Sequence, residues 1–297
     1  MLRDVETHRD GRGIAVDLRL HTRLDIMVPA WLASLDGVSC PNLSDWFRSL
    51  DHWRGVLPDD RPPPAATAAG HVDAYDFIGH LSDVLPPGEP VFVDTGGNLT
   101  WTCNGLRIKR GQRLISAWNN TPMGYALPAA IGAAFVAGTA GVTCIIGDGG
   151  LMICLAELAT LVRHNLPVKV LVFNNHAHGI QKQTLETWLN GHYVGVDGPS
   201  GLAFPPIDAV ARAMGLRVIT IAATGDIAAA LREAYAVPGP VLCNVEINPE
   251  QKLYPVLKFG SPLENQYPTL DPAFIAEQMI VPPVVCSAPI PAGTPGV

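Results

Sequence analysis

The chain has 297 residues, of which 48% are apolar and 16% charged, and its formal net charge is −7. The length allows one large or two modest domains with a buried core, and the low charge indicates extensive burial in a parallel sheet or at a subunit interface. The absence of Lys/Arg runs argues against nucleic acid and anionic membranes as partners, and no apolar run approaches the ~20 residues that span a bilayer.

The first 70 residues predict few elements. Residues 13–18 have a strand pattern, and residues 31–33 and 46–50 have short helical patterns. These are too few elements for an independent core. Residues 57–70 are rich in Pro and Ala and have the composition of a linker.

From residue 71 the pattern becomes regular. Helices are expected at 72–85, 123–137, 151–162, 207–214 and 227–235, and strands at 90–94, 113–116, 142–146, 168–173, 216–221 and 241–247. This alternation predicts an α/β fold with a doubly wound, mostly parallel sheet flanked by helices. The Pro- and Ala-rich stretch 281–297 is expected to be a flexible tail.

The six cysteines form no Cys-x-x-Cys pair, which argues against zinc and iron–sulfur sites. Several lie in apolar patterns, where a thiol behaves as a small hydrophobic group. The N-terminus is polar and charged and has no signal-peptide pattern. A reducing, cytoplasmic location is therefore expected.

Two polar turns are the most informative feature. The sequence Gly147-Asp148-Gly149-Gly150 follows one expected strand, and Asn174-Asn175 follows the next. Parallel strands place their carboxyl ends at one edge of the sheet, where ligands bind in open α/β folds. A carboxylate, an amide oxygen and loop backbone there can hold a hard divalent cation and a bound diphosphate. The alternative is a βαβ unit with ordinary turn chemistry.

This pair of turns resembles the metal and diphosphate motif of thiamine-diphosphate-dependent enzymes, in particular the acetolactate-synthase-like branch. The resemblance implies that Mg²⁺ is bound by the side chains of Asp148 and Asn175 and by the backbone carbonyl of Ala177. It also implies a thiamine-diphosphate-binding fold, in which the cofactor is contacted around the two turns by Gly147, Asp148, Gly149, Gly150, Asn175, Ala177, Gly179 and Ile180. Without Cβ atoms, Gly149 and Gly150 allow backbone N–H groups to approach phosphate closely.

Two further segments resemble the same family. Residues 119–133 are similar to its Gly-x-Met-Gly-x-x-Leu-Pro-Ala-Ala-Ile-Gly-Ala segment, which implies that Met123 wedges the cofactor rings apart and that Thr121 and Met123 make backbone contacts. Thr121 departs from the family's first Gly. Residues 94–98 resemble its Asp-x-Gly turn, with Thr95, Gly96 and Asn98 as cofactor contacts, although an ordinary strand-end turn explains them equally well.

The loop after Asn175 carries the catalytic candidates. Gln181 occupies a position where some decarboxylases of the family place a proton-donating Glu, which favours carbon–carbon ligation over simple decarboxylation. His176 and His178 are candidate acid/base groups, with exposed or hydrogen-bonded loop histidines as the alternative. Thr184 stands where true acetolactate synthases have a Trp, so acetolactate itself is not implied.

The family's cofactor-activating Glu lies on a pyrimidine-binding domain, for which the chain shows no pattern. The resemblance therefore implies a split enzyme. Residues 1–56 would be a remnant of the central domain and 71–280 the diphosphate-binding (PP) domain. A separate subunit would carry the pyrimidine domain in a hetero-oligomer such as α2β2. The expected reaction is decarboxylation of a 2-oxo acid and transfer of the acyl-anion equivalent to a carbonyl acceptor. The alternatives are a non-catalytic regulatory or structural subunit, a simple 2-oxo acid decarboxylase and a truncated gene.

Overall fold

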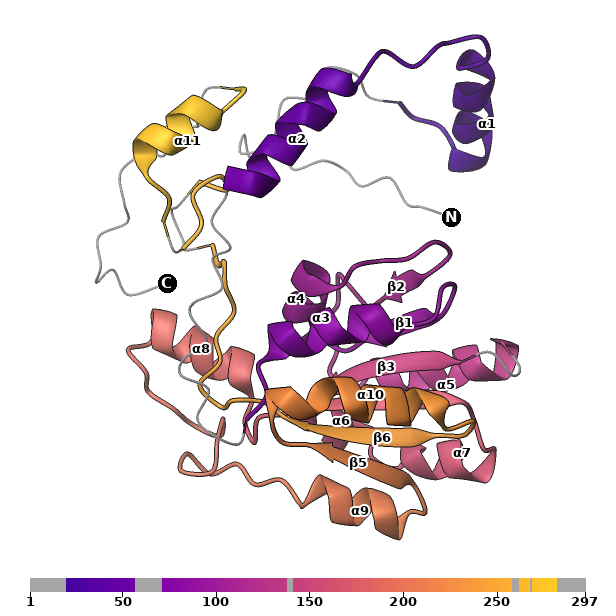
Figure 1. The fold of residues 1–297 in the computed structure, drawn as a ribbon, viewed down its shortest axis with the longest axis vertical. Coiled ribbons are helices and arrows are strands. Elements are labelled where there is room, and N and C mark those ends of the chain that lie inside the picture. Colours follow the sequence, from indigo (N-terminus) through magenta and orange to yellow (C-terminus); the bar gives the residue numbers. More distant parts are fainter. Residues whose placement is uncertain (1–19, 57–70, 138–140, 258–261, 268, 282–297) are drawn as a thin grey trace. The chain divides into compact units, whose positions relative to one another are not determined.

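A computed structural model describes residues 20–56, 71–137, 141–257, 262–267 and 269–281 (Figure 1). The chain divides into two compact units, Met1–Pro58 and Asp59–Val297. In the first unit the described elements are helices α1 (Leu24–Ser34) and α2 (Ser44–Val56), neither of which buries a residue. Both are longer than the sequence patterns indicate. The strand expected at 13–18, the linker at 57–70 and the tail from 282 onward lie outside the described residues.

The second unit contains a six-stranded sheet in the order β2-β1-β3-β4-β6-β5, and every neighbouring pair is parallel. Its strands are β1 (Pro90–Val93), β2 (Arg113–Ile115), β3 (Val142–Gly147), β4 (Val168–Asn174), β5 (Arg217–Ile221) and β6 (Val241–Glu246). The central strands are buried along most of their length because helices cover both faces of the sheet. The predicted doubly wound α/β fold is confirmed.

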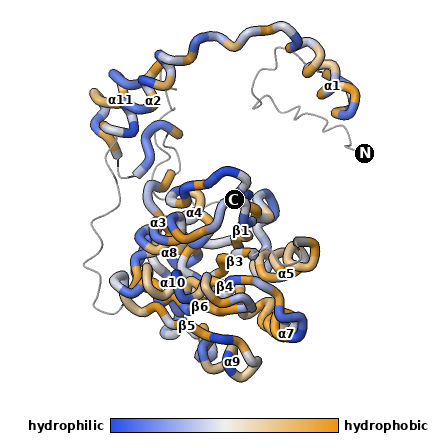
Figure 2. The backbone as a smooth tube through the Cα atoms, turned by 45° about the vertical axis from the view of Figure 1, so that its right-hand side comes forward, coloured by the Kyte–Doolittle hydropathy of each residue, from blue (hydrophilic) through white to orange (hydrophobic). Residues whose placement is uncertain are grey.

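Helices cover the two faces in separate groups. One face packs against α3 (Ala74–Val84), α4 (Gly97–Gly105) and α10 (Ile227–Ala236). The other packs against α5 (Ala126–Ala137), α6 (Asp148–Ile153), α7 (Glu157–Arg163) and α9 (Ile207–Ala213). Helix α5 is composed of apolar and small residues, and the hydropathy colouring in Figure 2 shows this. Alternate residues of each strand enter the two cores, as the pleat requires.

Several helices differ from the sequence expectations. Helix α5 begins at Ala126 rather than Met123, because Gly124 has a φ of 78°, which is incompatible with a right-handed helix. The helix expected at 151–162 is divided into α6 and α7 at Cys154. Helices α4, α8 (Gly179–Trp188) and α11 (Pro272–Gln278) were not expected.

The start and the end of the sheet unit are hydrogen-bonded to each other. Val72 forms a parallel bridge with Ile247. The Val72 N–H donates to the Glu246 carbonyl at 2.7 Å, and the Asn248 N–H donates to the Val72 carbonyl at 3.3 Å.

None of the helices in the described ranges combines the length and the apolar character that crossing a membrane requires.

Candidate functional site

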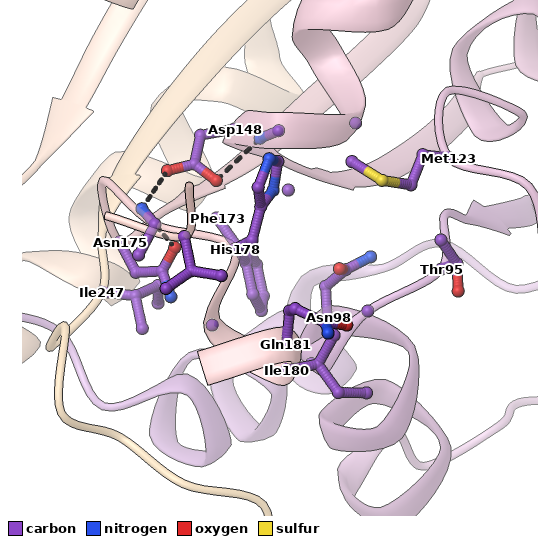
Figure 3. Close-up of a pocket in the computed structure, with 18 of the residues that line it drawn as sticks. Thr95, Asn98, Met123, Asp148, Phe173, Asn175, His178, Ile180, Gln181 and Ile247 are labelled. Atoms are coloured by element: carbon purple, nitrogen blue, oxygen red, sulfur yellow. Dashed lines mark hydrogen bonds between the residues drawn. The ribbon is translucent and has the colours of Figure 1, made fainter. Parts of the chain in front are cut away.

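The acidic turn joins the carboxyl ends of β3 and β4. Asp148 follows β3, is only 2% exposed, and is the first residue of α6. Its Oδ1 accepts a hydrogen bond from the Gly149 N–H at 2.8 Å, and its Oδ2 accepts one from the Ala177 N–H at 3.3 Å (Figure 3). The pairing of Gly147 with Phe173 places the two strand ends side by side, which makes this contact possible.

The amide turn contributes a second oxygen at the same place. The Asn175 Oδ1 accepts a hydrogen bond from the same Ala177 N–H, at 3.3 Å. Ala177 is buried and forms an antiparallel bridge with Asp197. The carboxylate of Asp148 and the amide oxygen of Asn175 therefore converge on one backbone group at the edge of the sheet.

The Asp148 carboxylate has no ion-pair partner among the described residues. Burial raises the pKa of Asp148 to about 7, and the N–H groups of Gly149 and Ala177 only partly oppose this effect. No Lys or Arg of the described residues forms an ion pair with it. Nor do three His, Cys, Asp or Glu side chains gather as a metal site within those residues. A cation here would depend on one carboxylate together with amide, backbone and ligand oxygens.

This raised pKa predicts a pH-dependent stability in the absence of metal. In the unfolded chain Asp148 has an ordinary pKa near 4, so its contribution to stability is present below that value and is lost as the pH rises through about 7. Between pH 5 and pH 8 we expect the free energy of unfolding to fall by about 2 kcal/mol from this group. Urea titrations in EDTA measure the free energy of unfolding at each pH, with Asp148→Asn as control. If this free energy changed with pH equally in both proteins, Asp148 would not have the raised pKa.

A second buried carboxylate holds the segment that carries Met123. Asp94 follows β1 and is 1% exposed. Its Oδ2 accepts from the Gly124 N–H at 2.9 Å and its Oδ1 from the Ala126 N–H at 3.1 Å. Burial raises its pKa, and the backbone N–H groups oppose the shift. The turn motif at 94–98 does not reveal this role of Asp94, because the two N–H groups that it accepts from lie about 30 positions further along the chain.

Three glycines let these side chains approach one another. A Cβ at Gly150 would lie 2.2 Å from the Asp94 Oδ2, and one at Gly149 would lie 2.6 Å from the His178 ring. A Cβ at Gly179 would lie 2.4 Å from the Asn175 Nδ2. Contacts within the protein therefore require glycine at these three positions, whether or not a ligand also approaches them.

A cavity of about 370 Å³ opens beside the two turns. It is lined by fourteen of the sixteen predicted site residues, namely Thr95, Gly96, Asn98, Met123, Gly147, Asp148, Gly149, Gly150, Asn175, Ala177, His178, Gly179, Ile180 and Gln181. The two that do not line it are Thr121 and His176. Its apolar wall is formed by Trp101, Phe173, Val194, Val196 and Ile247. These five residues are not predictable as site residues, because in the sequence each has the pattern of an ordinary strand, helix or loop residue.

The two loop histidines have different positions. The His178 ring faces the cavity next to Gly149 and contacts Phe204 edge-on, with ring centroids 5.7 Å apart. The His176 side chain is 60% exposed and forms a hydrogen bond of 2.9 Å with Glu246. Gln181 also lines the cavity, from the first turn of α8.

Comparison with known proteins identifies the family to which the sheet unit is similar. Residues 94–245 match the family described as thiamine pyrophosphate enzyme, C-terminal TPP binding domain. The acetolactate synthase isozyme 1 large subunit of Escherichia coli (strain K12) is 29% identical over 212 residues, which are 70% of this chain and 37% of that protein. The acetolactate synthase large subunit of Parasynechococcus marenigrum (strain WH8102) is 30% identical over 76% of this chain and 36% of its own length. The mitochondrial acetolactate synthase catalytic subunit of Saccharomyces cerevisiae (strain ATCC 204508 / S288c) is 28% identical over 79% of this chain and 34% of its own length. The matched part of the chain thus spans about a third of the length of these relatives.

Proposed function

Because the chain belongs to the thiamine pyrophosphate enzyme family and carries its C-terminal cofactor-binding domain, we propose that it is the diphosphate-binding part of an acetolactate-synthase-like carboligase. The proposed reaction is decarboxylation of a 2-oxo acid followed by transfer of the acyl-anion equivalent to an aldehyde or ketone. Within this proposal, residues 71–280 form the diphosphate-binding domain, and a second polypeptide in a reducing cytoplasm supplies the pyrimidine-binding domain.

The convergence of Asp148 and Asn175 on Ala177 is the observation that carries the proposal. A buried carboxylate without a cationic side-chain partner fits a bound cation, since isolated buried charge is otherwise costly. Mg²⁺ prefers oxygen ligands and retains substrate phosphates in its shell. In this assignment the Asp148 carboxylate, the Asn175 amide oxygen and the Ala177 carbonyl would hold Mg²⁺, whose charge would favour binding of a diphosphate at the same place.

Thiamine diphosphate, when bound, supplies the electron sink that decarboxylation of a 2-oxo acid requires. The protein would orient it from two sides. Met123 is 39% exposed and lines the cavity, and the next residue, Gly124, donates a hydrogen bond to Asp94. Because this segment is held in place, the Met123 side chain can support the cofactor rings. Thr95, Gly96 and Asn98 would contact the cofactor from the start of α4, and the apolar wall would exclude water.

The polar side chains of the cavity favour ligation. Gln181 donates and accepts hydrogen bonds but does not supply a proton, so protonation of the acyl-anion equivalent to an aldehyde has no donor at this position. His178 is the titratable group that we assign to proton transfer with the substrate, because its ring faces the cavity. His176 is removed from this role in the proposal, since it does not line the cavity.

Affinity purification of the tagged chain from its native host tests the proposal. We expect recovery of thiamine diphosphate together with a second protein, and 2-oxo acid turnover by the complex that the chain alone does not show. The physical reason is that the cofactor-activating carboxylate is assigned to the other polypeptide.

Mass spectrometry of the eluate identifies the second protein and thiamine diphosphate, and an assay of 2-oxo acid consumption measures turnover. A tagged Asp148→Ala chain is the control for cofactor recovery. Turnover by the isolated chain at an enzymatic rate would contradict the partner requirement. Recovery of this sequence inside one longer polypeptide would contradict the split. A complex with cofactor but without turnover would favour a non-catalytic subunit.

A further inference from the structure

The turn between the two metal-ligand positions contains a residue in an unfavourable backbone conformation. His176 lies between Asn175 and Ala177 and has a φ of 56°, in the left-handed region. Side chains with a Cβ adopt this region at an energetic cost, so neighbouring groups must hold the residue there. The His176 side chain is 60% exposed, which leaves little packing to provide that support.

Glu246 provides a hydrogen bond to this residue from the neighbouring strand. It is the last residue of β6 and pairs with Asn174, the last residue of β4. Its Oε2 accepts a hydrogen bond of 2.9 Å from the His176 Nε2, which carries the proton because an ionised carboxylate only accepts. The Glu246 side chain is 21% exposed, so the contact is partly shielded from water.

The other carboxylate oxygen fixes Glu246 itself. Its Oε1 accepts from the Asn244 Nδ2 at 2.8 Å and from the Asn174 Nδ2 at 3.4 Å. The Asn174 Oδ1 in turn accepts from the His176 N–H at 3.3 Å. Glu246 is thereby connected to both the backbone and the ring of His176.

These contacts continue to the site. The Asn174 carbonyl accepts from the Ile247 N–H at 2.9 Å, which anchors the start of the turn to β6. The end of the turn is anchored by the Ala177 N–H, which lies between the Asp148 and Asn175 oxygens. A change in the conformation of His176 would therefore displace the Asn175 side chain and the Ala177 carbonyl together.

We propose that Glu246 is a positioning residue that holds His176 in its left-handed conformation, so that Asn175 and Ala177 are presented to the metal and the diphosphate. This inference rests on the function proposed above. It assigns to the end of β6 a part in cofactor binding, although Glu246 does not line the cavity.

A mutant cycle on the full chain, in the assembly in which it is purified, tests the inference. Glu246→Ala should raise the Kd for Mg²⁺–thiamine diphosphate roughly three- to tenfold, the net effect of losing one typical intramolecular hydrogen bond in this half-exposed contact. Glu246→Gln should raise the Kd less than Glu246→Ala does, because its amide oxygen still accepts from the His176 Nε2 although its NH2 group replaces the acceptor of the Asn244 and Asn174 Nδ2 groups. His176→Gly should also stay within about twofold, because glycine adopts positive φ without support.

The decisive variant combines Glu246→Ala with His176→Gly. We expect its Kd, measured by calorimetry, to equal that of His176→Gly alone, because glycine makes the support unnecessary. A role limited to general stability would lower the melting temperature of Glu246→Ala without this rescue. An unchanged Kd in Glu246→Ala, or the same fold-loss in both backgrounds, would overturn the inference.

Amide hydrogen exchange separates this inference from the proposed function. In the cofactor-free protein, exchange in segment 174–178 should be faster in Glu246→Ala than in the unmodified chain or in Glu246→Gln. Equal exchange in all three would overturn the positioning role. If the unmodified chain bound no cofactor while this exchange difference was present, the proposed function would fail and the structural role of Glu246 would stand.

Discussion

Replacement of Asp148 by Ala is expected to lower the affinity for Mg²⁺–thiamine diphosphate by at least ~100-fold, since even residues that only support metal ligands cost 10–100-fold. Asp148 is the buried carboxylate at the meeting point of β3 and β4, and the other proposed ligand oxygens are neutral. Calorimetric titration of the cofactor in the presence of Mg²⁺ measures the effect, and a titration in EDTA separates the contribution of the metal.

The matched control is Asp226→Asn, because Asp226 is an exposed acidic residue that does not line the cavity. It should bind the cofactor with unchanged affinity. Asp148→Asn is informative as well, because it keeps an oxygen but removes the charge. It should lose most of the Mg²⁺-dependent binding while the cofactor-free protein becomes more stable at pH 8, where the buried carboxylate is ionised. Unchanged binding in Asp148→Ala would remove this residue from the site.

Gly150→Ala is expected to destabilise the fold by about 2–3 kcal/mol, as overpacking a tight interior commonly does. The new Cβ would lie 2.2 Å from the Asp94 Oδ2 and 3.1 Å from the Ile146 side chain. Asp94 would have to move, and its hydrogen bonds to the Gly124 and Ala126 N–H groups would be lost. Urea unfolding measures the loss of stability, and weaker cofactor binding should accompany it because Met123 lies in the displaced segment.

Gly132→Ala is the control for this substitution. Gly132 lies within α5, and a Cβ there would contact no atom within 4 Å. Alanine at a helical glycine with free space stabilises by roughly 0.5–1 kcal/mol, so the two Gly→Ala variants should change stability in opposite directions. A Gly150→Ala variant as stable as the unmodified chain would show that Asp94 does not occupy this position.

The sheet and the two polar turns were predictable because their signals are local. Each strand from 90 onward has an apolar run bounded by turn residues, and the residues after β3 and β4 must meet once those strands are parallel neighbours. Helix α4 was not predictable in this way. Its sequence, from Gly97 to Gly105, contains Gly, Asn and Thr, which have low helix propensity. It is stabilised by the packing of Trp101 in the core and by a hydrogen bond from the Asn98 Nδ2 to the Asp94 carbonyl.

The contacts that organise the site could not be predicted from local sequence patterns either. The support of the Met123 segment by Asp94 joins residues 30 positions apart, and the hydrogen bond between His176 and Glu246 joins residues 70 positions apart. The different positions of the His176 and His178 side chains accompany a left-handed φ of 56° at His176, which the sequence pattern does not indicate. Sequence identifies these side chains as polar loop residues, whereas their roles depend on distances across the sheet.

The bridge between Val72 and Ile247 has a consequence for how this unit can be combined with other domains. Because Val72 and Ile247 lie side by side, the chain enters the sheet and completes it at adjacent points. The residues that follow Ile247 still belong to the unit, since Leu253 lies in its core and Gln251 accepts a hydrogen bond from the Ala74 N–H. Further domains can therefore be joined before residue 72 and after residue 254 without interrupting a strand or this packing.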